Sequence, residues 1–161
     1  MSIAPTLQRY LDQKVTYDVL THEPTMSSTR TAQVCRISGD RLAKGIVLRR
    51  NSGYMLAVLP ASHHIRLDDL RHAIGDDIGL AREEEIDQLF RDCAHGAVPP
   101  VGECYGLEVV VDDAIEQQPD VYLEAGDHMT LIHLDRDQFA HLMAEARHAH
   151  FSQRIGATPP M

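Results

Sequence analysis

Residues 41–59 have the sequence RLAKGIVLRR-NSG-YMLAVL. The two flanking runs are rich in the aliphatic residues that fill strands, and the Asn-Ser-Gly between them is typical of a tight turn. This stretch therefore predicts a β-hairpin. Helix-like and strand-like segments occur on both sides of it, which favours a single α/β domain of the α+β type. Its sheet is expected to be mixed or largely antiparallel rather than doubly wound.

The same signals divide the rest of the chain into short elements. We expect helices over 5–13, 27–37, 68–75, 82–90 and 135–148, and further strands over 15–20, 107–111, 121–124 and 130–134. The exposed side or end of the last helix is expected to carry His141, His148 and His150. Paired prolines near the C-terminus indicate a tail, so we expect a domain over residues 1–150 and a C-terminal tail over 151–161.

The composition is that of a globular protein without a membrane span. The chain has 161 residues, of which 43% are hydrophobic and 24% charged, enough for one domain with a buried core. Its apolar runs are far shorter than the roughly 20 residues of a membrane helix. No basic region followed by an apolar one begins the sequence, and the three cysteines, Cys35, Cys93 and Cys104, are odd in number and unevenly spaced. We therefore expect a cytoplasmic protein without a disulfide framework.

The charge is unevenly distributed along the chain. The formal net charge is −9, yet residues 30–50 hold six Lys or Arg residues and the single acid Asp40, which leaves −14 on the remainder. An acidic body argues against broad nonspecific nucleic-acid binding, because affinity for phosphate backbones comes mainly from Lys and Arg. One basic segment fits a partner touched at one end, such as the terminus of an RNA. A solvated basic face with no partner is the simpler explanation of the same charges.

Lys44 is one of only two lysines in the chain. Strand alternation places its side chain on the same face as Leu42 and Ile46, so an ammonium emerges among aliphatic groups. A lone desolvated charge there is costly. Either the amine reaches a cleft with an anionic or carbonyl partner, or it extends along its stem to water. The neighbouring Gly45 would let another backbone or a ligand approach closely.

Residues 93–106 contain a loop with the pattern Gly-x-x-Pro-Pro-x-Gly, from Gly96 to Gly102. Glycine permits backbone angles closed to other residues, and proline removes both freedom and an N–H. The pattern thus predicts a rigid loop with a few exposed amides, which can hold a sugar or an oxyanion. It is neither a phosphate-binding P-loop nor a dinucleotide fingerprint. A stiff connector without a ligand is the alternative.

Several kinds of site are disfavoured by the motifs that are missing. The ten histidines and three cysteines form no CxxC or HExxH, and Cys93, His95 and Cys104 have no convincing fourth ligand, so no metal is expected. No Gly-x-Ser-x-Gly elbow is present, which excludes a serine hydrolase of that type. Cys35 falls in an expected helix with no base marked for it.

Taken together, these segments resemble the YbaK/EbsC family, the aminoacyl-tRNA editing domain related to the insertion domain of bacterial prolyl-tRNA synthetases. The resemblance covers roughly residues 5–145, and its most specific elements are the strand lysine, Lys44, and the family's G-x-x-x-P loop, here Gly96 to Pro100. The other matching segments are Thr21-His22-Glu23, residues 53–61, residues 109–112 and Ala125-Gly126.

The resemblance implies a mixed, partly barrel-like sheet surrounded by helices, and no metal or cofactor. It implies a freestanding trans-editing deacylase, a hydrolase that cleaves the ester of a mischarged tRNA, with tRNA for proline carrying a small wrong amino acid as the substrate. Lys44 would be catalytic. The substrate-binding residues would be His22, Gly45, Gly96, Ala97, Val98, Pro99, Pro100, Gly102, Ala125 and Gly126. The tRNA phosphates would be contacted by Arg30, Arg36, Arg41, Arg49 and Arg50.

Two departures from the family limit what the resemblance implies about the substrate. Members that clear alanine carry Asn after the lysine and a His-Pro pair in a late strand, where this chain has Gly45 and Ala125-Gly126. This places the chain nearer the YbaK-like branch, and residues 24–40, which should shape the amino-acid pocket, have no secure counterpart. The expected partners are the acceptor end of tRNA and, as a further candidate, an aminoacyl-tRNA synthetase, with neither DNA nor a membrane. A non-catalytic binding module of the same fold and an unrelated hydrolase remain alternatives.

Overall fold

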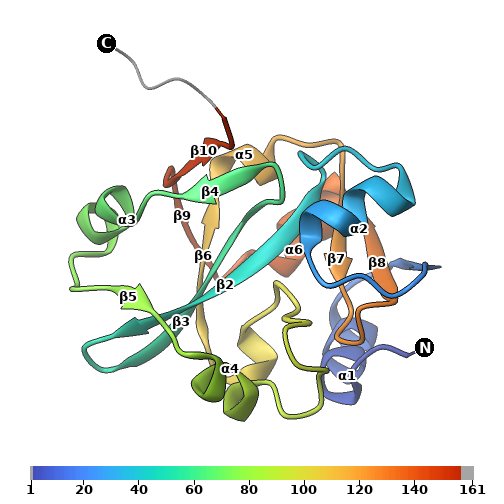
Figure 1. Ribbon diagram of the computed structural model, residues 1–161, viewed down its shortest axis with the longest axis horizontal. Coiled ribbons are helices and arrows are strands. Elements are labelled where there is room, and N and C mark those ends of the chain that lie inside the picture. The colour runs from blue at the N-terminus through green and yellow to red at the C-terminus, as the bar shows by residue number, and fades with distance from the viewer. Residues whose placement is uncertain (1, 157–161) are drawn as a thin grey trace.

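The computed structural model describes residues 2–156, in which helices cover both faces of one mixed sheet (Figure 1). The helices are α1 (Pro5–Lys14), α2 (Ser28–Cys35), α3 (Leu67–Ile74), α4 (Glu83–Leu89), α5 (Asp113–Glu116) and α6 (Arg136–Leu142), with a 3-10 turn η1 (Glu103–Tyr105). The strands are β1 (Asp18–Thr21), β2 (Leu42–Arg50), β3 (Gly53–Pro60), β4 (His63–Ile65), β5 (Gly79–Leu80), β6 (Glu108–Asp112), β7 (Asp120–Glu124), β8 (Thr130–Asp135), β9 (Arg147–Ala149) and β10 (Ser152–Arg154).

The predicted hairpin is confirmed and forms the centre of the sheet. β2 and β3 pair antiparallel from Ala43 opposite Pro60 to Arg50 opposite Gly53. Gly53 has φ +137°, a conformation that favours glycine, which explains the residue at the end of this tight turn. Nearly all of β3 is buried, because it lies between β2 and β6.

The sheet is mixed, as expected. Its order is β1-β8-β7-β2-β3-β6-β9, and β5 also pairs with β2. The pairs β2–β7, β3–β6 and β6–β9 are parallel, whereas the others in this sheet are antiparallel. The resemblance implies a partly barrel-like sheet. Among the described strands the sheet stays open and does not close into a barrel.

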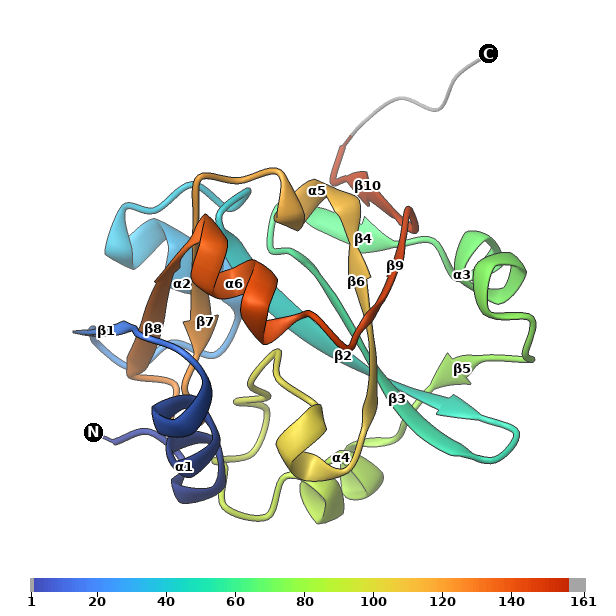
Figure 2. The ribbon, with the colours of Figure 1, turned by 180° about the vertical axis from the view of Figure 1, so that it is seen from behind.

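The two faces of the sheet are covered by different helices. One face packs on α1 and α6 through a large cluster that includes Leu7, Leu11 and Phe139 (Figure 2). The other packs on α3 through Leu70, and on α2 through Ala32 against Leu42 and Leu131. Within residues 2–156, no helix has the length and apolar character needed to cross a bilayer.

The C-terminal part differs from the expectation in two ways. The last helix ends at Leu142, and His148 lies in β9, with His150 just after it, because residues 147–149 pair with β6 instead of continuing the helix. Regular structure also continues past the expected boundary at residue 150. Phe151 is fully buried and β10 pairs with β4, so the ordered domain continues to at least residue 154. Residues 157–161 of the expected tail lie outside the described part.

Candidate functional site

The candidate site begins at a gap along one edge of β2. On this edge β7 pairs only with Leu42 and Ala43, and β5 pairs only with Leu48 and Arg49. Within residues 2–156, the segment between them, residues 44–47, has no strand neighbour on this edge. The loop that follows α4 lies against it instead: a Cβ added to Gly45 would be 3.2 Å from Pro100 Cα and 3.4 Å from Val98 Cγ1. Gly45 therefore permits the close approach that the sequence predicted.

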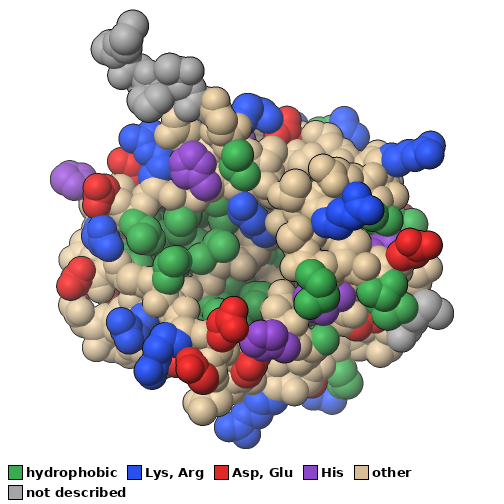
Figure 3. All heavy atoms as spheres, viewed as in Figure 1, with side chains coloured by type: hydrophobic (Ala, Val, Ile, Leu, Met, Phe, Trp, Pro, Cys, Tyr) green, Lys and Arg blue, Asp and Glu red, His purple; other side chains and the backbone are tan. Residues whose placement is uncertain are grey.

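A cavity of about 170 Å³ opens at this gap. Four segments line it: residues 25–31 leading into α2, residues 42–46 of β2, Gly96 and Val98 of the loop, and the end of β7 with the turn into β8. Figure 3 shows this face of the molecule hollowed near its centre, with hydrophobic side chains beside the hollow and basic, acidic and histidine side chains around it. The cavity joins the two features that sequence analysis singled out, the strand lysine and the glycine-proline loop.

Lys44 is half-buried and lines this cavity. Its neighbours on the same strand face, Leu42 and Ile46, are apolar and line the cavity too. Burial lowers the pKa of the Lys44 ammonium below its ordinary value. Among residues 2–156 no hydrogen bond or ion pair involves its side chain. Of the two alternatives left by the sequence, the structure supports the amine that reaches a cleft.

The loop of residues 94–98 is held in place from three directions. The N–H of Ala94 donates to the carbonyl of Gly126, and the ring Nε2 of His128 donates to the carbonyl of His95 at 2.6 Å. The His95 ring in turn contacts Asp87 of α4 at 2.9 Å, and this hydrogen bond raises the pKa of His95. Gly96 has φ +79°, which explains a glycine at this bend.

Two donors of this loop are left for a ligand. In the described part of the chain, no acceptor pairs with the main-chain N–H of Gly96 or Val98, and both residues line the cavity. Two uncommitted amides and an ammonium thus belong to residues that line one cavity, and N–H groups and ammonium groups both stabilise a negatively charged oxygen. Such a site suits a carbonyl oxygen that gains negative charge, or a phosphate oxygen.

The turn between β7 and β8 contributes two residues that sequence analysis missed, Glu124 and His128. One carboxylate oxygen of Glu124, Oε2, accepts hydrogen bonds from the main-chain N–H groups of Gly126, Asp127 and His128, at 2.8, 3.3 and 3.3 Å. Both Glu124 and His128 line the cavity. The sequence places Glu124 at the end of a predicted strand, which does not single it out, and only the β2–β7 pairing brings it beside Lys44.

Residues 25–31, for which the resemblance gave no counterpart, form the wall opposite the loop. Ser27 caps α2 by accepting from the N–H of Arg30, and the hydroxyls of Thr25 and Thr31 are hydrogen-bonded to each other in the interior. Met26 is 76% exposed and lines the cavity, so its side chain stands at the mouth. We expect this segment to determine which amino-acid side chain the cavity accepts.

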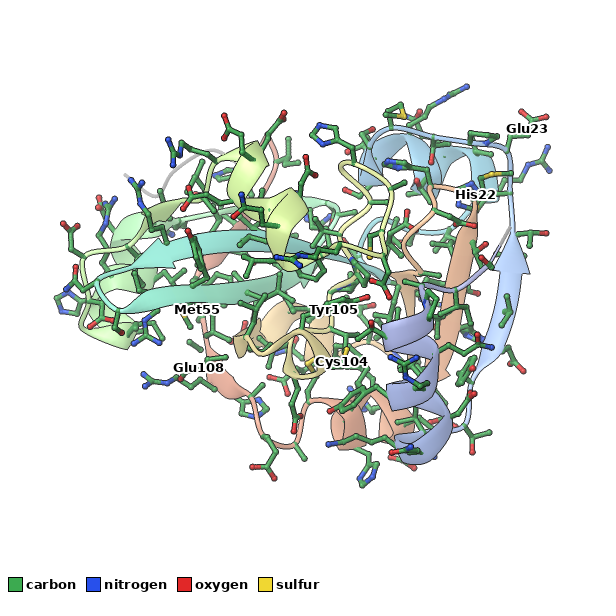
Figure 4. The ribbon with its side chains drawn as sticks, turned by 90° about the horizontal axis from the view of Figure 1, so that it is seen from below. His22, Glu23, Met55, Cys104, Tyr105 and Glu108 are labelled. Atoms are coloured by element: carbon green, nitrogen blue, oxygen red, sulfur yellow. The ribbon has the colours of Figure 1, made fainter. Side chains whose placement is uncertain are left out.

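The predicted substrate-binding residues divide into two groups. Gly45, Gly96 and Val98 line the cavity together with Lys44. The others do not line it: Ala97, Pro99, Pro100, Ala125 and Gly126 are buried behind it, and Gly102 lines a separate depression. His22 lies just beyond β1 beside Glu23, and its Nδ1 is hydrogen-bonded to the Glu23 carbonyl (Figure 4).

The five arginines predicted to contact phosphates are not equally available. Arg50 is paired with both Asp76 and Glu108, and Arg41 with Asp120 at 3.2 Å. The remaining three, Arg30, Arg36 and Arg49, have no acidic partner within residues 2–156. A phosphate would meet least competition from carboxylates at these three positions.

One group of side chains has the spacing of a metal site, namely Asp112, Asp113 and His150. Asp112 is completely buried, and its carboxylate accepts from the N–H groups of Ala114, Phe151 and Ser152 and from the Ser152 hydroxyl. These four donors satisfy the carboxylate and fix β10 to the domain. The group therefore has a structural explanation, and it is separate from the cavity.

The comparison with family models gives one match, the aminoacyl-tRNA editing domain, over residues 22–142. The chain belongs to this family. The matched region contains every segment that lines the cavity. No curated protein matches the chain in sequence at a significant level.

Comparison with solved structures confirms the fold of this chain. A protein described as a "putative trans-editing enzyme for prolyl tRNA synthetase" superimposes with a TM-score of 0.80 at 22% identity, covering 94% of this chain and 99% of that one. A protein described only as hypothetical gives 0.81 at 21% identity, with 92% and 99% covered. A protein from Marinobacter aquaeolei VT8 described as a "putative signal transduction protein" gives 0.74 at 19% identity, and there the match covers 94% of this chain but 31% of the other. The fold thus occurs both alone and within a longer chain.

Proposed function

We propose that the protein is a freestanding aminoacyl-tRNA deacylase, which hydrolyses the ester between a wrong amino acid and the terminal adenosine of a tRNA. The observation that carries the proposal is the half-buried Lys44, which has no ionic partner in the described part and faces a cavity bordered by two uncommitted amides. A chain of the editing-domain family with this arrangement has a place for the acylated end of a tRNA.

The chemistry required of the site is modest. An aminoacyl ester is already activated, so the enzyme needs to orient a water molecule and stabilise the negative charge that develops on the carbonyl oxygen. The N–H groups of Gly96 and Val98 and the ammonium of Lys44 provide positive charge for that oxygen or the terminal phosphate. Water adds to the carbonyl carbon, the bond to the ribose oxygen breaks, and this oxygen takes up a proton. The neighbouring ribose hydroxyl assists the water in this proposal, so no side-chain base is required.

The walls of the cavity favour a small amino acid. Leu42, Ile46 and Leu131 are apolar, and the cavity of about 170 Å³ is small. Such a pocket excludes larger side chains more firmly than it prefers smaller ones. The structural likeness to a protein described as a trans-editing enzyme for prolyl tRNA synthetase supports tRNA for proline as the first substrate to test. Arg30, Arg36 and Arg49, which have no acidic partner within residues 2–156, are the candidates for contacts with its phosphates.

The experiment is a panel of tRNAs carrying labelled wrong amino acids, incubated with the wild type and with Lys44→Ala. We expect the wild type to release a small amino acid and the variant to be slower by more than about 100-fold. Lys14→Ala is the matched control, because Lys14 is the only other lysine and pairs with Glu103 outside the cavity. Equal rates in Lys44→Ala and the wild type, at equal thermal stability, would remove Lys44 from the mechanism.

The same panel separates the proposal from a binding module of the same fold. His128, a titratable side chain at the cavity, is committed to the carbonyl of His95, which is the observation that favours binding without hydrolysis. A binding module slows the spontaneous loss of the amino acid from the tRNA. A deacylase accelerates it.

A further inference from the structure

Lys44 and Glu124 have opposite charges and line the same cavity without pairing with each other. They lie on neighbouring parallel strands, one residue beyond the paired Ala43 and Leu123. Because Ala43 and Leu123 both point into the large core, Lys44 and Glu124 both point to the opposite face. Yet no ion pair joins them, and burial alone lowers the pKa of Lys44.

The carboxylate of Glu124 is fixed but only half used. Its Oε2 accepts the three N–H groups of the β7–β8 turn, which restrains the side chain in one orientation. Its Oε1 takes part in no hydrogen bond with residues 2–156. Because Oε1 has no partner within that range and is not fully buried, it is accessible to solvent, and Glu124 is one of the residues that line the cavity. The cavity thus offers a preorganised acceptor for a cation opposite the ammonium of Lys44.

We infer that Glu124 binds the α-ammonium group of the acylated tRNA end and so makes the site selective for free aminoacyl esters. This inference rests on the proposed function and adds the group of the substrate that is recognised. An aminoacyl ester carries its cation one carbon away from the carbonyl where negative charge develops. That dipolar arrangement matches a cavity with a carboxylate and an ammonium held apart. A hydrogen bond between charged groups is about twice as strong as a neutral one.

The inference predicts which esters the enzyme leaves intact. An ester whose amino group is acylated, or replaced by a hydroxyl, has no cation for Glu124. The neutral group of such an ester would leave the Glu124 carboxylate without an ionic partner. Nothing would then compensate for the partial removal of this carboxylate from water. Peptidyl and N-formylated tRNA ends belong to this class, so the same carboxylate would protect them from hydrolysis.

The test compares alanyl-tRNA with lactyl-tRNA, which is made from it by nitrous acid and differs only in a hydroxyl for the amine. Each enzymatic rate is divided by the spontaneous rate of the same ester, because an α-ammonium group itself activates its ester. On this scale we expect the wild type to accelerate alanyl-tRNA at least about tenfold more than lactyl-tRNA, the factor that corresponds to one charge-assisted hydrogen bond. In Glu124→Gln this preference should disappear, through a smaller acceleration of alanyl-tRNA and an acceleration of lactyl-tRNA that does not fall. The amide oxygen of Gln still accepts the N–H groups of the turn, so the variant should keep its fold. Glu84→Gln, an exposed glutamate of α4, is the control for net charge.

Each outcome decides the matter. A preference for alanyl-tRNA that persists in Glu124→Gln, or a wild type that treats both esters alike, overturns the role of Glu124 and leaves the deacylase proposal standing. If the wild type hydrolyses neither ester, the deacylase proposal fails on these substrates. Binding then tests Glu124 separately, with non-hydrolysable adenosine amides that carry an alanyl or a lactyl group at the 3′ position. Tighter binding of the alanyl form by the wild type, lost in Glu124→Gln, supports the inference, and equal binding refutes it.

Discussion

The ring Nε2 of His128 donates to the main-chain carbonyl of His95 at 2.6 Å, and thereby joins the β7–β8 turn to the loop that carries Gly96. The ring of His95 points the other way and contacts Asp87, with Glu83 nearby at 3.3 Å. One residue of the loop is thus anchored on two sides, through its main chain and its side chain. The position of the loop amides at the cavity depends on both anchors.

The side-chain anchor should depend on pH. Hydrogen bonding to Asp87, together with the nearby Glu83, raises the pKa of His95 above 6.5. Because the folded pKa is higher than the unfolded one, the contribution of this contact to stability is complete below about pH 6.5 and is lost as the pH rises through the folded value. We expect the NMR titration midpoint of His95 to lie above the ordinary value, and Asp87→Asn to lower it. An unshifted midpoint in the wild type would contradict the anchor.

Gly45→Ala should move the loop. The new Cβ would lie 3.0 Å from Leu56 Cδ1 and 3.2 Å from Pro100 Cα, and the second atom is main chain and cannot rotate away. Overpacking of this kind costs about 1–3 kcal/mol in unfolding free energy, which chemical denaturation measures. The control is Gly79→Ala in β5, where an added Cβ meets nothing within 4 Å. Equal stability of the two variants would show that the loop does not press on β2 as described.

Phe151→Ala tests whether the domain extends beyond residue 150. Phe151 is fully buried in the cluster that contains Leu70 and Met55, so its truncation should cost about 3–5 kcal/mol in unfolding free energy. Ile155→Ala, at a position 55% exposed, should change stability by less than about 0.5 kcal/mol. Thermal and urea unfolding distinguish the two. A loss of unfolding free energy as small as that of Ile155→Ala would show that residue 151 lies outside the stable domain.

The sequence predicted what depends on local patterns. The β2–β3 hairpin has its turn residues and alternating strands within one short stretch, and Ser27 and Asp135 cap helices as their residue types suggest. The predicted C-terminal end of the last helix was wrong because it depends on a contact that is distant in sequence. Residues 147–149 leave the helical pattern only because β6, distant in sequence, pairs with them.

The candidate site shows the same division. Lys44 and Gly96 were found because each is unusual in its own segment, a lysine among aliphatic residues and a glycine before paired prolines. Glu124 has no such local signal, since a glutamate at a strand end is ordinary. Its importance comes from the register that places it beside Lys44. The phosphate contacts of the arginines stay a prediction. The pairing of Arg50 with Asp76 and Glu108 could not be read from the sequence, because it is decided by tertiary contacts.

The gap along one edge of β2 also has a consequence for solubility. Since the carbonyl of Leu42 accepts from Ala61 of the hairpin, alternation turns the N–H and C=O of Gly45 toward the unoccupied edge. An open edge of this kind is a template on which a second molecule adds a strand and aggregation starts. Pro99 and Pro100 carry no N–H with which to extend a ladder, and Pro100 packs directly on Gly45. The loop that carries Pro99 and Pro100 therefore also shields the protein from intermolecular strand addition.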